Sequence, residues 1–174
     1  TLRAVVLDGA GDEAFCAGAD IQEFERGGPS TSMFESENLH SVIERCSVPV
    51  VAKIDGYCLG GGLGLAMECD FRFASERSIF GLPEVELVIS PGHRLLRPLS
   101  ALVGPSRAKE IGILGEQFSA EQAEADGLVD YLYPYKEVDD AVQAFVAKLV
   151  DKPAGPVRYV KDIVNIYKGH SGAE

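Results

Sequence analysis

The stretch GYCLGGG at residues 56–62 lies between an apolar run, residues 48–54, and a segment whose apolar residues recur near helical spacing, residues 63–69. This order predicts a buried strand, a tight glycine turn and the start of a helix. Glycines leave the backbone open to a ligand, and the first N–H groups of a helix have no partner inside the helix. Such a turn favours negative charge, for example on a carbonyl oxygen that becomes an oxyanion.

The same glycine turn has two other interpretations. It can be a purely structural turn that lets a helix pack closely against a strand. It can also be a dinucleotide site, because glycines after a strand cradle pyrophosphate. The fingerprint GxGxxG, started at Gly60, would need a glycine where Leu65 stands, so the dinucleotide interpretation does not fit.

The flanking segments extend the pattern in both directions. Residues 2–7 read LRAVVL and end at turn residues, as residues 48–54 do, and a helical stretch at residues 31–45 joins them. Two buried strands joined by a helix imply parallel pairing through a crossover, right-handed by default. Residues 70–74 alternate like a third strand. Further elements are predicted in order: helices at residues 95–103 and 106–114, a short helix opened by Ser119 and ended by Gly127, a strand at 128–133, and helices at 138–150 and 157–168.

Composition and charge exclude several classes of partner. The 174 residues are 46% hydrophobic and carry a formal net charge of −11, with the basic residues scattered, so nucleic acid is not an expected partner. No apolar run reaches the roughly 18 residues of a membrane span, and we expect no membrane partner and a cytoplasmic or organelle-matrix location. The four cysteines form no CxxC pair, so we expect neither a zinc site nor a disulfide framework, and no metal.

Two other segments carry possible chemistry. Residues 15–21 read FCAGADI, a small-residue turn after the first strand whose backbone could supply a second hydrogen-bond donor. Residues 80–84 read FGLPE and place one carboxylate, Glu84, after a rigid proline in apolar sequence. Burial should raise the pKa of Glu84 toward the operating pH, as a general acid/base requires. Taken singly, each segment is better explained as structural: a turn, and a surface or capping glutamate.

Together, in this order and at this spacing, the three segments resemble the crotonase superfamily, also called the enoyl-CoA hydratase/isomerase superfamily. Its members stabilise the enolate of an acyl-CoA thioester. The resemblance implies an α/β fold: a crotonase-like core of ββα units wound as a spiral at residues 1–134, and a C-terminal helical region at residues 135–174. Compared with the family pattern, the chain looks truncated at both ends. The family resemblance also implies a homotrimer or a hexamer.

The resemblance assigns roles to particular residues. It implies that the backbone N–H groups of Ala19 and Gly61 form an oxyanion hole and that Glu84 is the catalytic acid/base. It implies that the backbone oxygens of Ala17 and Ala19 receive the CoA adenine. The residues expected to contact CoA are Ala17, Ala19, Asp20, Ile21, Gly60 and Gly61. Coenzyme A would enter as part of the substrate, and no other cofactor is implied.

One departure from the family pattern bears on the reaction. Hydratases of this superfamily carry a second glutamate two residues after the glycine run, where this chain has Gly64. One carboxylate can take a proton from C2 and return it at C4, so an enoyl-CoA isomerase is favoured. Hydration or hydration-cleavage of an unusual acyl-CoA, and acyl-CoA binding without catalysis, remain alternatives. Glu68 and Glu86 are considered as substitutes for the missing glutamate, although a surface ion pair, for example with Arg72, is favoured for Glu86.

A second departure follows Pro91 and Gly92, where residues 93–98 read HRLLRP in place of the small residues common in the family. In the family this loop lies near the acyl pocket, so the basic residues could admit an acyl group with a carboxylate. The alternative is a loop that faces solvent, in which His93 is simply exposed.

Overall fold

The computed structural model describes residues 2–20 and 42–168, which form two four-stranded sheets. The first sheet contains four parallel strands in the order β1 (Val5–Asp8), β3 (Val50–Ile54), β5 (Phe71–Ser75) and β8 (Tyr131–Tyr133). The parallel pairing expected between the strands at residues 2–7 and 48–54 is confirmed, with Val5 opposite Val50. The sequence therefore places the strands of this sheet to within a few residues.

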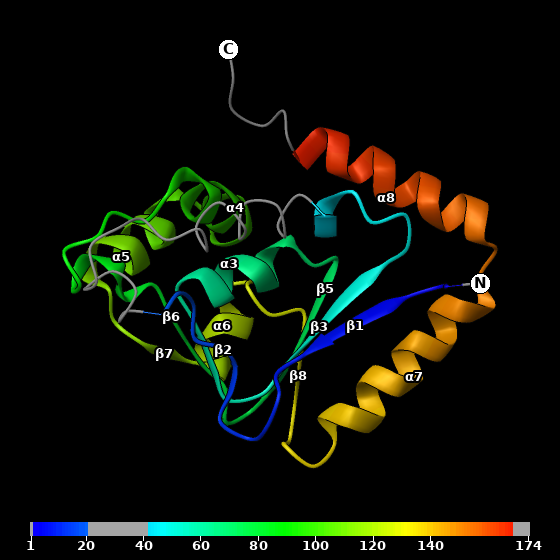
Figure 1. Ribbon diagram of the computed structural model, residues 1–174, viewed down its shortest axis with the longest axis horizontal. Helices are drawn as coiled ribbons and strands as arrows, with labels where there is room; N and C mark the ends of the chain where they lie inside the picture. Colours follow the sequence, from blue (N-terminus) through cyan, green and yellow to red (C-terminus); the bar gives the residue numbers. More distant parts are fainter. Residues whose placement is uncertain (1, 21–41, 169–174) are drawn as a thin grey trace.

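The second sheet is built from much shorter strands. Its order is β2 (Ala14–Cys16), β4 (Tyr57–Leu59), β6 (Ile79–Gly81) and β7 (Phe118–Ser119), with only β7 antiparallel. From β1 to β6 the strands alternate along the chain between the first and the second sheet, whereas β7 joins the second sheet directly after β6 and β8 returns to the first (Figure 1). This is the predicted mixed α/β arrangement of repeated ββα units.

Six α-helices and one 3-10 helix fall within the described residues. The helices are α3 (Gly61–Glu68), α4 (His93–Val103), α5 (Pro105–Leu114), α6 (Ala120–Ala125), α7 (Val138–Asp151) and α8 (Ala154–Lys168), and the 3-10 helix η1 is Pro83–Val85. The predicted cap is confirmed at α6, where the Ser119 hydroxyl accepts the N–H of Gln122 at 3.3 Å. The helix predicted at residues 31–45 lies mostly outside the described residues, but residues 42–44 are helical.

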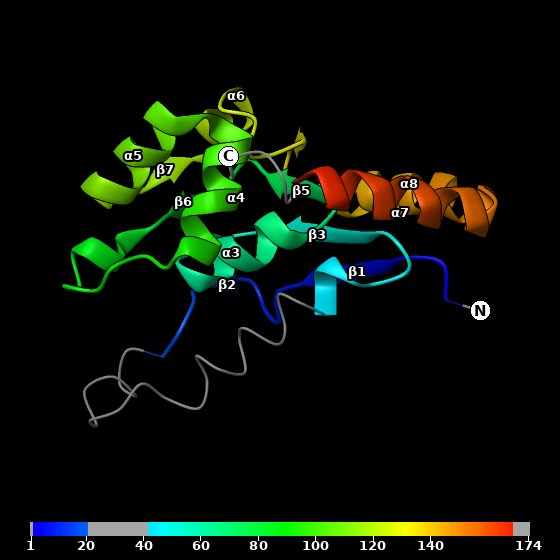
Figure 2. The ribbon, with the colours of Figure 1, turned by 90° about the horizontal axis from the view of Figure 1, so that it is seen from above.

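The first sheet is covered on both faces. Successive residues of β3 alternate between them: Val50, Ala52 and Ile54 join the core around α3, whereas Val51 packs with Val138 and Val142 of α7. Helix α3 is mostly buried, and α7 and α8 lie on the opposite side of the molecule from α4 and α5 (Figure 2). No helix in the described part of the chain is long and apolar enough to cross a membrane.

A buried arginine ties α3 to the strands. Arg72, 5% exposed, donates to the carbonyl oxygens of Leu128 at 2.9 Å and Cys69 at 2.8 Å and pairs with Asp130 at 2.8 Å. The guanidinium atoms Nε, Nη1 and Nη2 therefore each have a polar partner, which a buried charge requires. The pairing suggested between Glu86 and Arg72 is wrong, because Arg72 faces inward toward Asp130 while Glu86 is exposed.

Helix α8 is fixed to the core by a lysine. Lys161 is 8% exposed, and its Nζ lies 2.6 Å from Asp70 Oδ2 and 3.0 Å from the Val48 carbonyl oxygen. The same Asp70 oxygen accepts the Val50 N–H at 2.7 Å. The side chain of Asn165 also donates to the carbonyl of Glu44 at 3.1 Å. Polar contacts therefore join α8 to the start of β3 and to the residue before β5.

Candidate active site

The glycine turn between β4 and α3 has a backbone shape that only glycine adopts readily. Gly60 has φ 53° and ψ −124°, and its N–H donates to the Gly81 carbonyl at 3.0 Å. The Gly64 N–H closes the first helical turn on the Gly60 oxygen at 3.1 Å. The N–H of Gly61, an exposed residue, therefore precedes the first bond of the helix and has no partner inside it.

The turn after β2 lies directly against this glycine turn. A Cβ added to Gly18 would lie 3.1 Å from the nitrogen of Gly61, and one added to Gly61 would lie 3.6 Å from Gly18 Cα. Gly18 has φ 90°, again in the left-handed region. Ala19 follows it and is exposed. The fold thus brings together the two turns that the sequence singled out, main chain against main chain.

The next glycine fits equally closely against β2. A Cβ added to Gly62 would stand 2.0 Å from the Cys16 carbonyl oxygen, which is far inside van der Waals contact. Gly62 is buried in the first turn of α3. Gly62 therefore allows the helix to pack closely against the strand, which is the structural explanation given above for the glycine run. Gly60 has a different role, because it forms the turn that precedes the helix.

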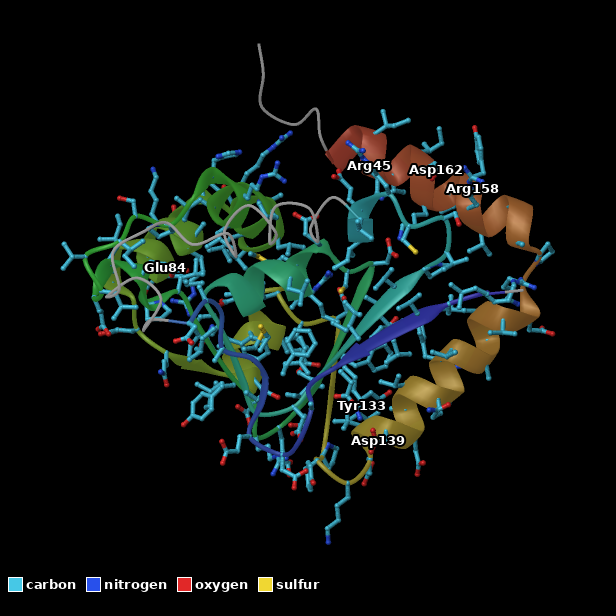
Figure 3. All side chains as sticks on the ribbon, viewed as in Figure 1. Arg45, Glu84, Tyr133, Asp139, Arg158 and Asp162 are labelled. Carbon is cyan, nitrogen blue, oxygen red and sulfur yellow. The ribbon has the colours of Figure 1, made fainter. Side chains whose placement is uncertain are left out.

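Glu84 reaches the same point from η1. A Cβ added to Gly60 would lie 3.1 Å from Glu84 Oε1, so the carboxylate lies against the glycine turn (Figure 3). Its other oxygen, Oε2, is buried without a hydrogen-bond partner among the residues that the structure describes. Burial raises the pKa of Glu84 above 4.5, an effect opposed by a weaker backbone hydrogen bond. The raised pKa expected from the sequence is confirmed.

The titration of Glu84 should be visible in the stability of the fold. Because its pKa is higher in the folded chain, the folded chain binds this proton more tightly than the unfolded chain does. The resulting stabilisation is fully present below pH 4.5 and is lost as the pH rises through the folded pKa. The melting temperature of Glu84→Gln minus that of the wild type should therefore increase across this range and then level off. Thermal melts of both proteins, with Glu86→Gln as the reference, measure it, and a constant difference contradicts it.

The turn that carries Glu84 is closed by an unusual residue. The Glu84 carbonyl accepts the Ile89 N–H at 2.9 Å, and the Val85 carbonyl accepts the Val88 N–H at 3.2 Å. This pair of bonds is a Schellman motif, whose penultimate position is normally glycine. Here it is Val88, with φ 59°, the one residue other than glycine with positive φ in the described part of the chain. Val88 is also 95% exposed.

Val88→Gly should stabilise the protein by about 0.5–1 kcal/mol. The left-handed conformation costs an L-residue about 1–2 kcal/mol, and glycine removes this cost. The greater conformational freedom of glycine in the unfolded chain offsets part of the stabilisation. The expected rise in melting temperature is about 1–4 °C. Val88→Ala is the matched control, since it truncates the side chain but keeps the backbone penalty. A melting temperature that falls equally in both variants would show that the valine side chain makes stabilising contacts.

The other residues that the sequence singled out lie at different distances from the contact between Glu84 and Gly60. Ala17 and Asp20 are exposed on the turn with Ala19, whereas Ile21 lies outside the described residues. Gly64 is buried in α3 and presents no side chain. Glu68 ends α3, about 10 Å along the helix axis from Gly61, which separates it from Glu84. His93 is exposed, as the solvent-facing interpretation predicted, but residues 93–98 are the first residues of helix α4 and not a loop.

Glu86 turns away from the carboxylate of Glu84. It is exposed, and its Cγ would lie 3.2 Å from a Cβ added to Gly115, at the end of α5. Two residues apart on an extended segment they would share a face, but η1 makes this segment helical, so they do not. The described residues thus bring one carboxylate, Glu84, to the glycine turn.

Known proteins match the chain along almost its whole length. The sequence model of the family described as enoyl-CoA hydratase/isomerase matches residues 1–169. The short-chain-enoyl-CoA hydratase of Clostridium acetobutylicum is 34% identical over 165 residues, which are 93% of this chain and 63% of that protein. The crotonyl-CoA hydratase of Syntrophomonas wolfei is 34% identical over 171 residues, covering 94% of this chain and 64% of its own length.

A solved structure agrees with these sequence matches. The crystal structure of an enoyl-CoA hydratase from Bacillus anthracis superposes with a TM-score of 0.86 at 34% identity, over 93% of this chain and 64% of that one. The chain thus spans less than two thirds of the length of these three relatives. Since both the sequence and the two-sheet fold match over nearly all of its length, the chain belongs to the enoyl-CoA hydratase/isomerase family, the crotonase superfamily.

Proposed function

We propose that the protein binds an acyl-CoA thioester with its carbonyl oxygen between the backbone N–H groups of Ala19 and Gly61. The observation that carries this proposal is the contact of Glu84 with Gly60, beside the open first turn of α3. Proton removal from C2 would place negative charge on the thioester oxygen. Two fixed donors would stabilise that charge, and losing one such donor costs about 3–4 kcal/mol in comparable sites.

The reaction we propose is isomerisation of an enoyl-CoA. The Glu84 carboxylate takes a proton from C2 of a 3-enoyl-CoA, the double bond shifts into conjugation, and the same carboxyl group returns the proton at C4. This shift needs one acid/base group, in agreement with the absence of a side chain at Gly64 and the distance of Glu68 along α3. Hydration is the second candidate, because relatives such as those from Clostridium and Syntrophomonas are named hydratases.

A turnover assay separates the two reactions. With purified protein and a 3-enoyl-CoA, isomerisation raises the absorbance of the conjugated thioester, whereas hydration of a 2-enoyl-CoA lowers it. The proposal requires the first change to be faster than the second. If hydration is faster, the proposed isomerisation is wrong and hydration is the reaction. Water would then be activated by a group other than a glutamate at position 64.

The pH dependence of turnover tests the role of Glu84 as a base. The carboxylate form must be present to remove the C2 proton, so kcat/KM should rise with pH on the acidic side and level off. Because burial raises the pKa of Glu84, the midpoint of this rise should lie above 4.5. A pH series of kcat/KM measures it, and a profile flat down to 4.5 would contradict the assignment of Glu84 as the base.

Binding without turnover is a separate outcome. We propose that CoA lies along the exposed turn that contains Ala17, Ala19 and Asp20, with the adenine at the backbone oxygens of Ala17 and Ala19. A CoA thioester should then raise the melting temperature, and NAD should not. Stabilisation by CoA without turnover of any enoyl-CoA would identify a binding protein.

We also propose that the protein forms a homotrimer or a hexamer. Light scattering, which gives the mass of the particle in solution, measures this.

A further inference from the structure

Two cysteines are register partners on neighbouring strands of the second sheet. Ala14 of β2 lies opposite Tyr57 of β4, and Cys16 lies opposite Cys58, so Phe15 is an extra residue in β2. This bulge is what brings the two cysteines side by side. Parallel neighbours lie about 4.8 Å apart, inside the window of about 4.4–6.8 Å between Cα atoms that a disulfide requires. Both are free thiols.

The two thiols face the same interior. Cys58 is fully buried in the core cluster around α3, and Cys16 packs against that cluster while remaining partly exposed. Burial raises the pKa of Cys58 well above its usual value, and negative charge on Cys16 or on Cys69 would raise it further. Cys16 is therefore the more exposed residue of the two.

Each cysteine lies close along the chain to one of the two proposed hydrogen-bond donors. Cys16 is the last residue of β2 and stands three residues before Ala19, and Cys58 of β4 stands three residues before Gly61, the first residue of α3. The packing here has little slack, because a Cβ on Gly62 would stand 2.8 Å from Cys16 Cβ. Any change in the separation of β2 and β4 therefore moves the turns at Gly18 and Gly60 relative to each other.

We propose that Cys16 and Cys58 are a redox modification site, which peroxide converts to a disulfide that distorts the turns that follow the two cysteines. The Cys16 sulfur attacks the peroxide O–O bond, an S–O bond forms, and water leaves. The Cys58 sulfur then attacks the resulting sulfenic acid, the S–S bond forms, the S–O bond breaks and a second water leaves. Two thiols are oxidised and one hydrogen peroxide is reduced to two waters.

The structure also indicates the speed and the effect of this reaction. The Cys58 thiol is buried and its pKa is raised, so little of it is present as the reactive thiolate and disulfide formation should take minutes to hours. The strand spacing already fits the Cα separation of a disulfide, but the bond holds the two Cβ atoms only about 3.8 Å apart, so Cys16 and Cys58 must tilt toward each other and twist the backbone that leads into the two turns. If the proposed enoyl-CoA chemistry is right, turnover should fall by about tenfold or more, because small misplacements of catalytic groups have effects of that size.

Mass spectrometry tests the pair without reference to activity. After hydrogen peroxide treatment, the intact mass should fall by about 2 Da, peptide mapping should join Cys16 to Cys58, and dithiothreitol should reverse both changes. Cys16→Ser should abolish the mass change, and Cys46→Ser should retain it. A disulfide between other cysteines, a cross-link between chains, or a mass gain from irreversible oxidation of Cys16 would overturn the proposal.

Turnover is then measured on the same samples. The wild type should lose activity with peroxide and regain it with dithiothreitol, while Cys16→Ser should keep its activity throughout. Since Cys16 is partly exposed, this serine variant avoids the folding risk of changing Cys58. If the Cys16–Cys58 disulfide forms but the protein turns over no enoyl-CoA, the proposed function is wrong and the proposed redox site is supported. If the protein turns over enoyl-CoA but no disulfide forms, the proposed redox site is wrong.

Discussion

Glu84→Gln is expected to lower kcat for enoyl-CoA isomerisation by about 10²–10⁴-fold, the usual contribution of a general acid/base. The amide keeps the size of the side chain beside Gly60 but cannot accept the C2 proton. The carboxylate has no hydrogen-bond partner on Oε2 within the described residues, so the substitution breaks no observed bond at that atom. The melting temperature should therefore not fall at neutral pH, and substrate binding should persist. Steady-state kinetics together with thermal melts measure both properties.

Glu86→Gln is the matched control for this experiment. It makes the same chemical change two residues away, at an exposed side chain that points toward Gly115. It should leave kcat within about twofold of the wild type, because substitutions at exposed positions rarely disturb a site that they do not contact. Equal losses in the two variants, or an unchanged kcat in Glu84→Gln, would remove Glu84 from the mechanism.

Lys161→Met is expected to reduce the free energy of unfolding by about 3 kcal/mol. Methionine fills a similar volume but leaves the partly buried Asp70 carboxylate without its cation, and removing one partner of a buried ion pair costs about 3–5 kcal/mol. The Val48 carbonyl also loses its donor from α8. Chemical denaturation of the variant and the wild type measures the difference.

Two controls separate charge burial from a general weakening of α8. Arg158 and Asp162 form an ion pair at 3.4 Å on the same helix, but both side chains are more than half exposed (Figure 3). Arg158→Met should therefore change the free energy of unfolding by no more than about 0.5 kcal/mol. The double variant Lys161→Met, Asp70→Asn should recover part of the loss, since no unpaired charge remains. A small effect of Lys161→Met alone would mean that water reaches Asp70.

The fold was predictable where strands are long enough to show a pattern. The runs around β1 and β3 are mostly apolar and end at turn residues, and the residues of β5 alternate between apolar and polar, so each strand is visible in the sequence. Strands β2, β4, β6 and β7 have two or three residues each, too few for any periodicity, and were not predicted individually. Their pairing with neighbouring strands of the second sheet, which is tertiary structure, defines them.

The candidate site was predictable as three segments, and its details were not. Glycines after a strand and a carboxylate after a proline are visible in sequence, and the fold brings Gly60 and Glu84 together. The Schellman turn closed by Val88 was missed, because valine gives no sign of a left-handed backbone. The pairing of Cys16 with Cys58 was missed as well, since it depends on the bulge at Phe15, which shifts the register by one residue.

The contact between the Gly18 turn and the glycine turn at Gly60 and Gly61 also bears on how enzymes of this kind diversify. The proposed donors are main-chain amides, and every residue except proline supplies one. Ordinary side-chain replacement at Ala19 therefore leaves the electrophilic half of the site chemically intact. Under the proposed mechanism, a side chain gained at position 64 would change what happens to the enolate without altering the two donors. The proposed main-chain donors are in this way insulated from the side-chain substitutions that would select the product.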